Sequence, residues 1–351
     1  MSDLTIKWKD SPLYPLNADA LHQIHPMENA AQEPFMAAHS QTELVIYAHT
    51  ALKIINTNVH KVFQVGNADL EFTIASKLDT GAIAAGLDYY VYVCDDVNDT
   101  ASIKISLNSS YPAGYNAQTS RKIGGFHTLC VAVGTIAGHS LTGFAVKAVL
   151  PASVWCLNHR PRCNPEGMVY STQAKLWVDI YLQSGTGGTT ASVYNATVTD
   201  TRDWMDFNDD LAAVGKRLLG DDEFQAIAAG SNEETNIFGS GDPVTTGGHV
   251  DTASVRMVSH LGVEDACGAF LQWLRTPSVR LDDSTTAGWI NLTGAKGSFY
   301  TYGTNGYGNT QLLAGGAWSY GTSCGSRCRS ASSARWSTIS SLGARFVSEP
   351  L

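Results

Sequence analysis

Short apolar runs, separated by polar residues, predict a series of short β-strands in the first half of the chain. The runs are rich in β-branched and aromatic residues, and Asn, Gly and Asp separate them. They lie at 42–48 (TELVIYA), 51–55 (ALKII), 61–65 (KVFQV), 70–76 (LEFTIAS), 88–94 (DYYVYVC) and 102–107 (SIKISL). We therefore predict a domain of meandering strands over residues 41–154. Residues 1–40 carry Pro, His and Met without periodicity, and we expect an N-terminal arm that needs a partner surface to become ordered.

The second half combines one apolar run, two helices and a long loop-rich region. The apolar run 176–182 (LWVDIYL) follows a connector that carries Pro and Cys. A helix is predicted over 208–219, because its first turn is acidic and its last turn carries Lys and Arg, as the helix dipole favours. A second predicted helix, 221–229, also begins with acidic residues and ends at Gly230, a common helix terminator. Short apolar pieces in Gly-, Ser- and Thr-rich sequence complete an α+β domain over 155–351.

Composition places the chain in the globular class. It has 351 residues, of which 44% are hydrophobic and 16% charged, which excludes a disordered or coiled-coil protein and predicts two domains. The formal net charge of −9 argues against a general affinity for nucleic acid or for anionic membranes. The first residues lack the basic and apolar regions of a secretory signal, and no apolar run reaches the length of a membrane span. We therefore expect neither classical secretion nor membrane insertion.

One sequence pattern is typical of a nucleophilic serine. Gly321 to Gly325 spell G-x-S-x-G, the nucleophile elbow of α/β-hydrolases. That fold requires a His after the Ser, but the last His of the chain is His260, and no helical pattern follows Gly325. We interpret the match as a chance feature of a Ser-rich loop, and we expect no catalytic residue.

Cysteine and histidine residues form two further candidate sites. Cys156, His159 and Cys163 have the spacing C-x2-H-x3-C, which supplies three soft ligands for zinc but no fourth, so free thiols and a solvated His are the favoured interpretation. Cys324 and Cys328 share a loop with arginine neighbours and are candidate redox thiols. Seven Cys residues without regular spacing indicate free thiols rather than a disulfide framework.

An acidic stretch precedes the first predicted helix. Its carboxylates suit a hard cation, but they lack EF-hand spacing, so a solvated segment with a helix N-cap is favoured. The residues are Asp200, Asp203, Asp206, Asp209 and Asp210.

The Ser-rich segment 315–346 is the strongest candidate for a binding surface. Ser supplies adaptable hydrogen bonds and Tyr supplies rigid contact area, so both are favoured in binding loops. Trp318, Trp336 and Leu342, together with spaced glycines, punctuate the polar residues as anchors would. The pattern favours an ordered binding surface over a polar C-terminal tail.

Several segments resemble a known family. GKRLLGDDEFQAIAAG (215–230), GVEDACGAFLQWL (262–274), LLAGGAW (312–318) and LGARF (342–346) resemble the landmarks of the formylglycine-generating-enzyme type of C-type lectin fold. DYYVYVCDD (88–96), YPAGYNAQTSRKIGGFH (111–127) and WVDIYL (177–182) resemble the tropism-determinant family. Members of that family are phage receptor-binding variable proteins, which a diversity-generating retroelement diversifies.

The resemblance implies an α+β chain in which an N-terminal all-β domain is followed by a C-type lectin fold domain. It implies a non-enzymatic receptor-binding adhesin that uses no cofactor. The expected state is a homotrimer on a virion tail fibre, made in the host cytoplasm; the alternative location is a bacterial cell surface. Expected partners are a host cell-surface protein or glycan receptor, further copies of the chain and other tail-fibre proteins.

The resemblance also assigns variable positions within 315–346, to which Tyr320 and Ser340 are added for their chemistry. The candidate ligand-binding residues are Ala317, Ser319, Tyr320, Gly321, Ser323, Ser330, Ser332, Ser333, Ser337, Ile339, Ser340 and Ser341. Leu342 and Phe346 also align with variable positions but are interpreted as packing residues. Gly325, Ser326, Arg327, Ala344 and Arg345 match fixed scaffold positions.

Two alternative functions stay open. The enzyme branch of this fold, the formylglycine-generating-type oxidases, binds copper through a cysteine pair. Those two positions correspond here to Tyr320 and Gly325, which disfavours an oxidase. The second alternative is a static structural virion protein with no ligand of its own.

Overall fold

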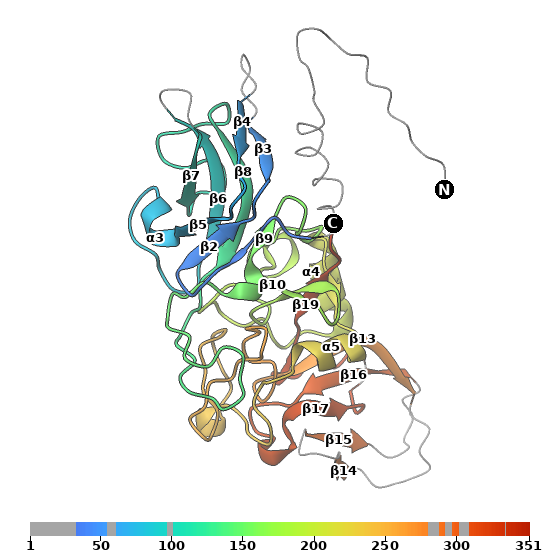
Figure 1. Cartoon of the computed structure of the whole chain (residues 1–351). Coiled ribbons are helices and arrows are strands. Elements are labelled where there is room, and N and C mark those ends of the chain that lie inside the picture. The colour runs from blue at the N-terminus through green and yellow to red at the C-terminus, as the bar shows by residue number, and fades with distance from the viewer. Residues whose placement is uncertain are drawn as a thin grey trace, which may run out of the picture.

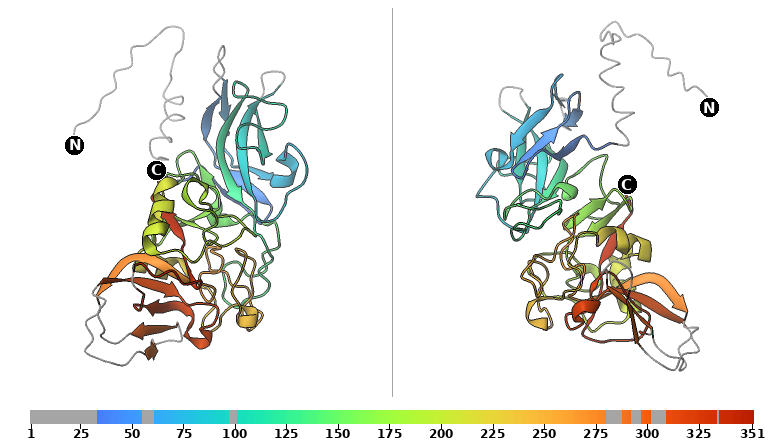
Figure 2. Two further views of the ribbon diagram at one scale, coloured as in Figure 1. Left: turned by 180° about the vertical axis from the view of Figure 1, so that it is seen from behind. Right: turned by 60° about the horizontal axis from the view of Figure 1, so that its bottom comes forward.

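The computed structural model describes residues 33–54, 61–96, 101–279, 288–291, 297–301, 309–333 and 335–351. An N-terminal β part, blue to green in Figure 1, is followed by a larger part that contains two helices and two sheets (Figures 1 and 2). Most of the expected arm, residues 1–32, lies outside the described residues. Across the ranges given above, no helix is long and apolar enough to cross a membrane.

The N-terminal part consists of three small sheets. The first has the order β1-β2-β5, the second pairs β3 with β4, and the third has the order β7-β6-β8-β9. The strands are β1 (Met36–Ala38), β2 (Glu43–Ile46), β3 (Ala51–Ile54), β4 (Lys61–Gln64), β5 (Leu70–Thr73), β6 (Asp88–Asp95), β7 (Ala101–Ser106), β8 (Ser120–His127) and β9 (Trp155–Cys156). Buried side chains of these sheets, such as Ile46, Val91 and Phe126, form one common core.

Each of the six strands predicted in this part is present, with one correction. The run 70–76 is a strand only as far as Thr73, because Ile74–Lys77 forms the short helix α3 and the Ile74 side chain enters the core. The predicted limits of 41–154 are also exceeded at both ends. β1 lies within the expected arm and pairs with β2, and β9 lies beyond the expected boundary and pairs with β8.

The first sheet of the C-terminal part has the order β10-β11-β19-β12 and is antiparallel. Its strands are β10 (Met168–Ser171), β11 (Leu176–Asp179), β12 (Arg217–Leu218) and β19 (Phe346–Ser348). β19 is the last strand of the chain, yet it lies in the interior of this sheet, between β11 and β12. The last residues therefore complete a sheet that begins near residue 168.

The two predicted helices are present with shifted boundaries. Helix α4 (Trp204–Ala213) begins four residues before the prediction, because the Asp203 side chain accepts a hydrogen bond from the Asp206 N–H at 2.8 Å and caps the helix there. It ends early because Arg217 and Leu218 pair with β19. Helix α5 (Asp221–Ile227) begins where the Glu223 carboxylate accepts the Gly220 N–H at 2.6 Å.

The second sheet is drawn in orange and red in the lower part of Figure 1 and has the order β14-β15-β17-β16-β13-β18. Its strands are β13 (Leu271–Val279), β14 (Gly288–Asn291), β15 (Ser298–Thr301), β16 (Asn309–Gly315), β17 (Gly325–Ser330) and β18 (Leu342–Gly343). Short 3-10 turns lie at η1 (Pro151–Ser153), η2 (Gly187–Thr189), η3 (Phe238–Ser240) and η4 (Gly321–Ser323). Because segment 315–346 supplies β17, β18 and the first residue of β19, it is an ordered part of the fold and not a tail.

Candidate functional site

Two consecutive glycines direct the chain from β16 into the Ser-rich segment. Gly315 and Gly316 both have a φ of 91°, a conformation that favours glycine. A Cβ on Gly315 would lie 2.5 Å from the carbonyl oxygen of Ala266, and one on Gly316 would lie 2.7 Å from the Cys324 sulfur. The next anchor is Trp318, whose N–H donates to the Ala269 carbonyl at 3.0 Å and whose ring packs edge-on against Phe270. The turn before residue 319 is therefore fixed by close approaches at Gly315 and Gly316, where a side chain on any other residue type would clash.

Nine of the twelve candidate residues reach solvent. Ser319 and Ser340 are exposed, and the side chain of Ile339 is 54% exposed. The partly exposed residues are Tyr320, Gly321, Ser323, Ser332, Ser337 and Ser341. They come from η4 and the two residues before it, from the residues after β17 and from the residues before β18. We call these nine residues the Ser-rich face.

The other three candidates are buried, which corrects the expectation that each faces a ligand. Ala317 is 0% exposed and belongs to an apolar cluster with Phe207 and Leu342. The Ser330 hydroxyl lies 2.8 Å from that of Ser332, and Ser330 is 1% exposed because it lies on the central strand β17. Ser333 is also buried. The burial of Leu342 and Phe346 agrees with their interpretation as packing residues.

The cysteines of this segment support the turn. Cys324 and Cys328 are both fully buried, and the Cys324 thiol donates to the Ala317 carbonyl at 3.3 Å. Burial raises the pKa of the Cys328 thiol to about 12, so it stays protonated at neutral pH. Burial also raises the pKa of the Cys324 thiol. These thiols lack the exposed, electropositive surroundings of a reactive cysteine, so their candidate redox role finds no support in the geometry.

Two arginines of segment 315–346 anchor it to the rest of the fold. The Arg329 guanidinium lies 5.0 Å above the Phe224 ring and also contacts the Asp221 carboxylate on α5. Arg345 is completely buried and donates to the carbonyl oxygens of Asp179 at 2.9 Å and Ile180 at 2.6 Å. Burial lowers the pKa of Arg345 to about 10, which leaves it charged at neutral pH.

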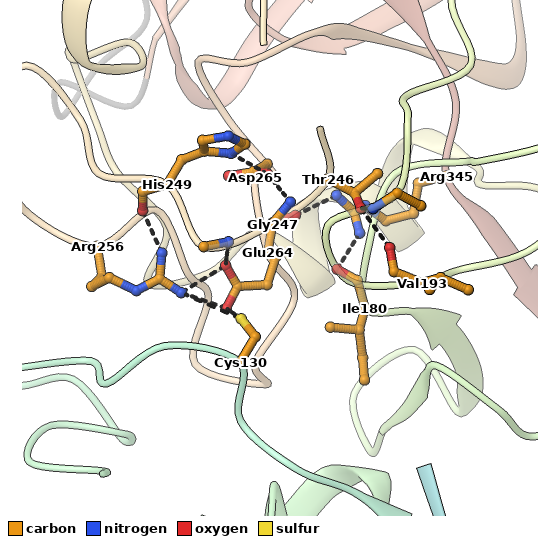
Figure 3. A network of polar contacts seen from close by, with 12 residues as sticks. Cys130, Ile180, Val193, Thr246, Gly247, His249, Arg256, Glu264, Asp265 and Arg345 are labelled. Carbon is orange, nitrogen blue, oxygen red and sulfur yellow. Dashed lines mark hydrogen bonds and ion pairs between the residues drawn. The ribbon is translucent and has the colours of Figure 1, made fainter. Parts of the chain in front are cut away.

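Arg345 belongs to a larger polar network, shown in Figure 3. Its guanidinium also donates to the main-chain oxygen of Glu264. The carboxylate of Glu264 accepts from Arg256 at 2.7 Å on both oxygens, and both of these side chains are buried. Asp265 accepts from the Gly247 N–H and lies 2.9 Å from Nδ1 of His249. Loops with little regular structure are thus fixed by charge-assisted hydrogen bonds.

An aromatic group beside the face is not evident from the sequence. The Trp289 ring lies 5.1 Å from the Tyr320 ring and 4.8 Å from the Tyr300 ring, with both pairs close to perpendicular. Trp289 is 38% exposed, so the group offers apolar contact area to solvent. Burial raises the pKa of Tyr320, which keeps its phenol neutral. The pairing of β14 with β15, and of β15 with β17, brings Trp289 close to Tyr320, so no local pattern in the sequence marks this contact.

The remaining sequence candidates have structural roles. Cys156 is buried with its thiol 3.0 Å from Asn158, and Cys163 contacts the Met168 sulfur at 3.6 Å. His159 packs among aromatic rings, 4.5 Å from Tyr170, which corrects the expectation of a solvated His. In the described ranges, no group of three potential ligands is arranged to hold a metal ion.

The acidic stretch is likewise built into the fold. Asp203 caps α4, as the sequence predicts for this stretch. Asp210 is buried and accepts from Gln183, from the Gly187 N–H and from Arg202. The solvated character expected of the whole stretch is therefore wrong for Asp210.

Comparison with known proteins places these features in a family context. The model of the Mtd second domain matches residues 34–156. The tail fiber receptor-binding protein of Bordetella phage BPP-1 is 30% identical over 255 residues. The match covers 65% of this chain and 64% of that protein, so this chain spans less than two thirds of its length. The I1 and P3c variants of the major tropism determinant are 27% identical with a TM-score of 0.70, covering 92% of this chain and 84% of each of theirs. The M1 variant gives a TM-score of 0.69.

These matches confirm the fold class that the sequence predicts, a β domain followed by a lectin-like α+β domain. They also confirm the resemblance to the tropism determinants, which extends over both parts of the chain.

Proposed function

We propose that this chain, which is similar in sequence and in fold to the major tropism determinants, is a receptor-binding adhesin of a phage or prophage tail fibre. The observation that carries the proposal is the contrast between the Ser-rich face and its support. Ser319 and Ser340 are exposed, while the same segment is held in place by the buried Arg345 and by the close approaches at Gly315 and Gly316. Side chains on such a face can change with little loss of stability, since exposed substitutions usually cost within about 0.5 kcal/mol.

The ligand of this face is a host cell-surface protein or glycan. Small hydroxyl side chains give adaptable hydrogen bonds but little binding energy each, so affinity at one site is modest. The group formed by Trp289, Tyr300 and Tyr320 supplies the rigid apolar area that binding hot spots favour. A homotrimer on several fibres, in contact with other tail-fibre proteins, adds avidity of about two to four orders of magnitude.

Diversification by a retroelement is part of the same proposal. The nine residues of the Ser-rich face are the positions where change is tolerated, and Trp318, Gly325 and Arg345 are those where it is not. Sequencing of codons 315–346 across a population of the source tests this division, with codons 168–182 as the control segment. Substitutions concentrated on the face support the proposal, whereas equal variation in both segments contradicts it.

A binding experiment tests the adhesin directly. The fluorescently labelled chain is incubated with a panel of bacterial isolates from its source, together with a variant carrying Ser319→Asp, Ser332→Asp and Ser337→Asp. Three carboxylates on the face add charges that a neutral contact must desolvate, so we expect at least a tenfold loss of binding. Thr172→Asp, in an exposed turn between β10 and β11, is the matched control. Equal retention of the triple variant and the control would overturn the proposal.

An oxidase or other enzyme is not favoured by any feature of the site. The two relevant thiols are buried and protonated, and the similar protein of Bordetella phage BPP-1 is a receptor-binding protein.

A further inference from the structure

A cleft opens in the N-terminal β part, away from the Ser-rich face. It has a volume of about 630 Å³, within the range of about 300–1,000 Å³ that is typical of ligand sites. Phe63, Leu70, Phe72 and Ile103 supply apolar lining from strands β4, β5 and β7. The cleft therefore lies where three separate sheets meet.

Two strand edges border this cleft. β5 is the last strand of the sheet β1-β2-β5, and β7 is the last strand of the sheet β7-β6-β8-β9. An edge strand presents backbone N–H and C=O groups that its own sheet does not use. Both strand edges at the cleft can therefore pair with an added strand.

The direction of these backbone groups follows from their neighbours. On β7, Ile105 accepts the Asp79 N–H at 2.8 Å on the side away from β6, so Ala101 and Ile103 present their groups on that same side. On β5, Ile74 donates to Thr42 toward β2, so Glu71 and Thr73 present theirs away from β2. Ala101, Ile103, Glu71 and Thr73 all line the cleft.

One segment of this chain has the pattern that such a cleft accepts. The arm as a whole has no sustained periodicity, but residues 4–9 read LTIKWK, with apolar Leu4, Ile6 and Trp8 alternating with polar residues. Alternation with a period of two places the apolar side chains on one face of an extended strand. The segment thus offers an apolar face to an apolar cleft.

Charge also complements the cleft. Lys7 and Lys9 are the alternating polar residues, and the cleft contains the carboxylates of Glu43 and Glu71. Glu71 lies 3.5 Å from His39 and half of its side chain is exposed, and Glu43 accepts from Ser40 at 3.1 Å. Lys77 also lines the cleft. Its positive charge is complemented by the negative charge of Asp3, which precedes the alternating segment.

We propose that residues 4–9 of the same chain bind in this cleft as an added β-strand between β5 and β7. The linker, residues 10–33, spans up to about 80 Å at roughly 3.3 Å per residue, so the segment reaches the cleft without strain. A tethered segment has an effective concentration near the millimolar range, which favours the chain's own segment over that of a second copy. Strand addition pairs both exposed edges and covers the apolar lining.

Hydrogen exchange of the full-length chain tests the proposal. Ile6→Asp places a carboxylate on the apolar face of the segment, so the amides of Glu71, Thr73, Ala101 and Ile103 are expected to exchange at least tenfold faster. His25→Asp, in the linker, is the matched control and is expected to leave these rates unchanged. Equal rates in Ile6→Asp and the parent chain would overturn the proposal.

Two further measurements test whether the segment belongs to the same chain and whether its charges pair with the cleft. If the segment comes from a second copy, protection of these amides falls on dilution, which would overturn the assignment to the same chain. Lys7→Glu alone is expected to remove the protection of these amides. The double variant Lys7→Glu, Glu71→Lys, in which the two charges are exchanged, is expected to restore it. Failure of that rescue contradicts the proposed charge complementarity between the segment and the cleft, even where Ile6→Asp destabilises the chain as a whole.

Discussion

The imidazole Nε2 of His127 lies 3.0 Å from the hydroxyl oxygen of Tyr181, and this contact joins the two parts of the chain. His127 ends β8 of the N-terminal part, whereas Tyr181 follows β11 of the lectin-like part. The other ring nitrogen, Nδ1, lies 3.0 Å from the Asp88 carboxylate, so the imidazole bridges an acid and a phenol. Both His127 and Tyr181 are buried.

Loss of this hydroxyl is expected to destabilise the whole chain. Tyr181→Phe keeps the ring but leaves the Nε2 atom of His127 without its partner, which costs about 1–3 kcal/mol for a buried group. Urea unfolding measures the change in the free energy of unfolding. Tyr47→Phe, at an exposed ring, is the control and is expected to change stability by less than about 0.5 kcal/mol. Coincident unfolding curves for the two variants would contradict a structural role for the bridge.

The burial of Ala317 separates it from Ser319, two residues further along the chain. Ala317→Tyr forces a large side chain into the cluster with Phe207 and Leu342, so we expect a loss of about 1–3 kcal/mol from overpacking. Ser319→Tyr places the same side chain in solvent and is expected to leave the melting temperature nearly unchanged. Thermal unfolding of both variants checks this difference; a tolerated tyrosine at residue 317 would return that position to the set of variable binding residues.

His139 makes the stability of the chain depend on pH. Burial lowers its pKa, because the charged imidazolium is poorly solvated there. Nδ1 accepts the Leu141 N–H at 3.0 Å and Nε2 lies 3.1 Å from the Val258 carbonyl, so the neutral ring satisfies both contacts. The ring of His260 lies only 4.7 Å away.

The sign of this dependence follows from the lowered pKa. The unfolded chain binds the proton more readily, so stability is full above the unfolded pKa of about 6.5 and falls as the pH drops below it. His139→Gln removes the titrating group, and we expect a smaller fall in melting temperature between pH 7 and pH 5 than in the parent chain. His39→Gln, at an exposed histidine, serves as the control. The same fall in His139→Gln as in the parent would exclude this histidine as the cause.

Thiol chemistry provides an independent test of the fold. All seven cysteines are free, and only Cys163 is not fully buried. Burial raises the pKa of Cys163 as well, so even this thiol is expected to react slowly. Titration with an aromatic disulfide reagent at pH 8 is expected to detect at most one thiol in the native chain, and none in Cys163→Ser. Fast reaction of several thiols without denaturant would contradict the burial of Cys324 and Cys328.

The sequence predicts elements better than it predicts their ends. Runs of β-branched and aromatic residues locate the strands of the N-terminal part, because the side chains of each run favour a strand locally. The end of the first helix depends instead on the pairing of Arg217 and Leu218 with Phe346 and Val347, more than a hundred residues away. No local pattern at Leu218 carries that information.

In the candidate site, too, the sequence predicts some features and misses those that depend on distant residues. Ser319 and Ser340 are polar residues in a polar segment, and they reach solvent as their composition indicates. Ala317 is buried because the turn at Gly315 and Gly316 directs it inward, and the geometry of that turn is set by Ala266 and Cys324. The contact of Trp289 with Tyr320 depends on strand pairing within the second sheet, so it is visible only in three dimensions.

The interior position of β19 makes the fold depend on the last residues of the chain. A premature stop or a shift of reading frame anywhere in residues 317–341 removes Arg345 and the strand that lies between β11 and β12. Such a product leaves two strand edges open and the carbonyl oxygens of Asp179 and Ile180 without their donor. Only a chain that is read in frame to its last residues can therefore close the sheet between β11 and β12.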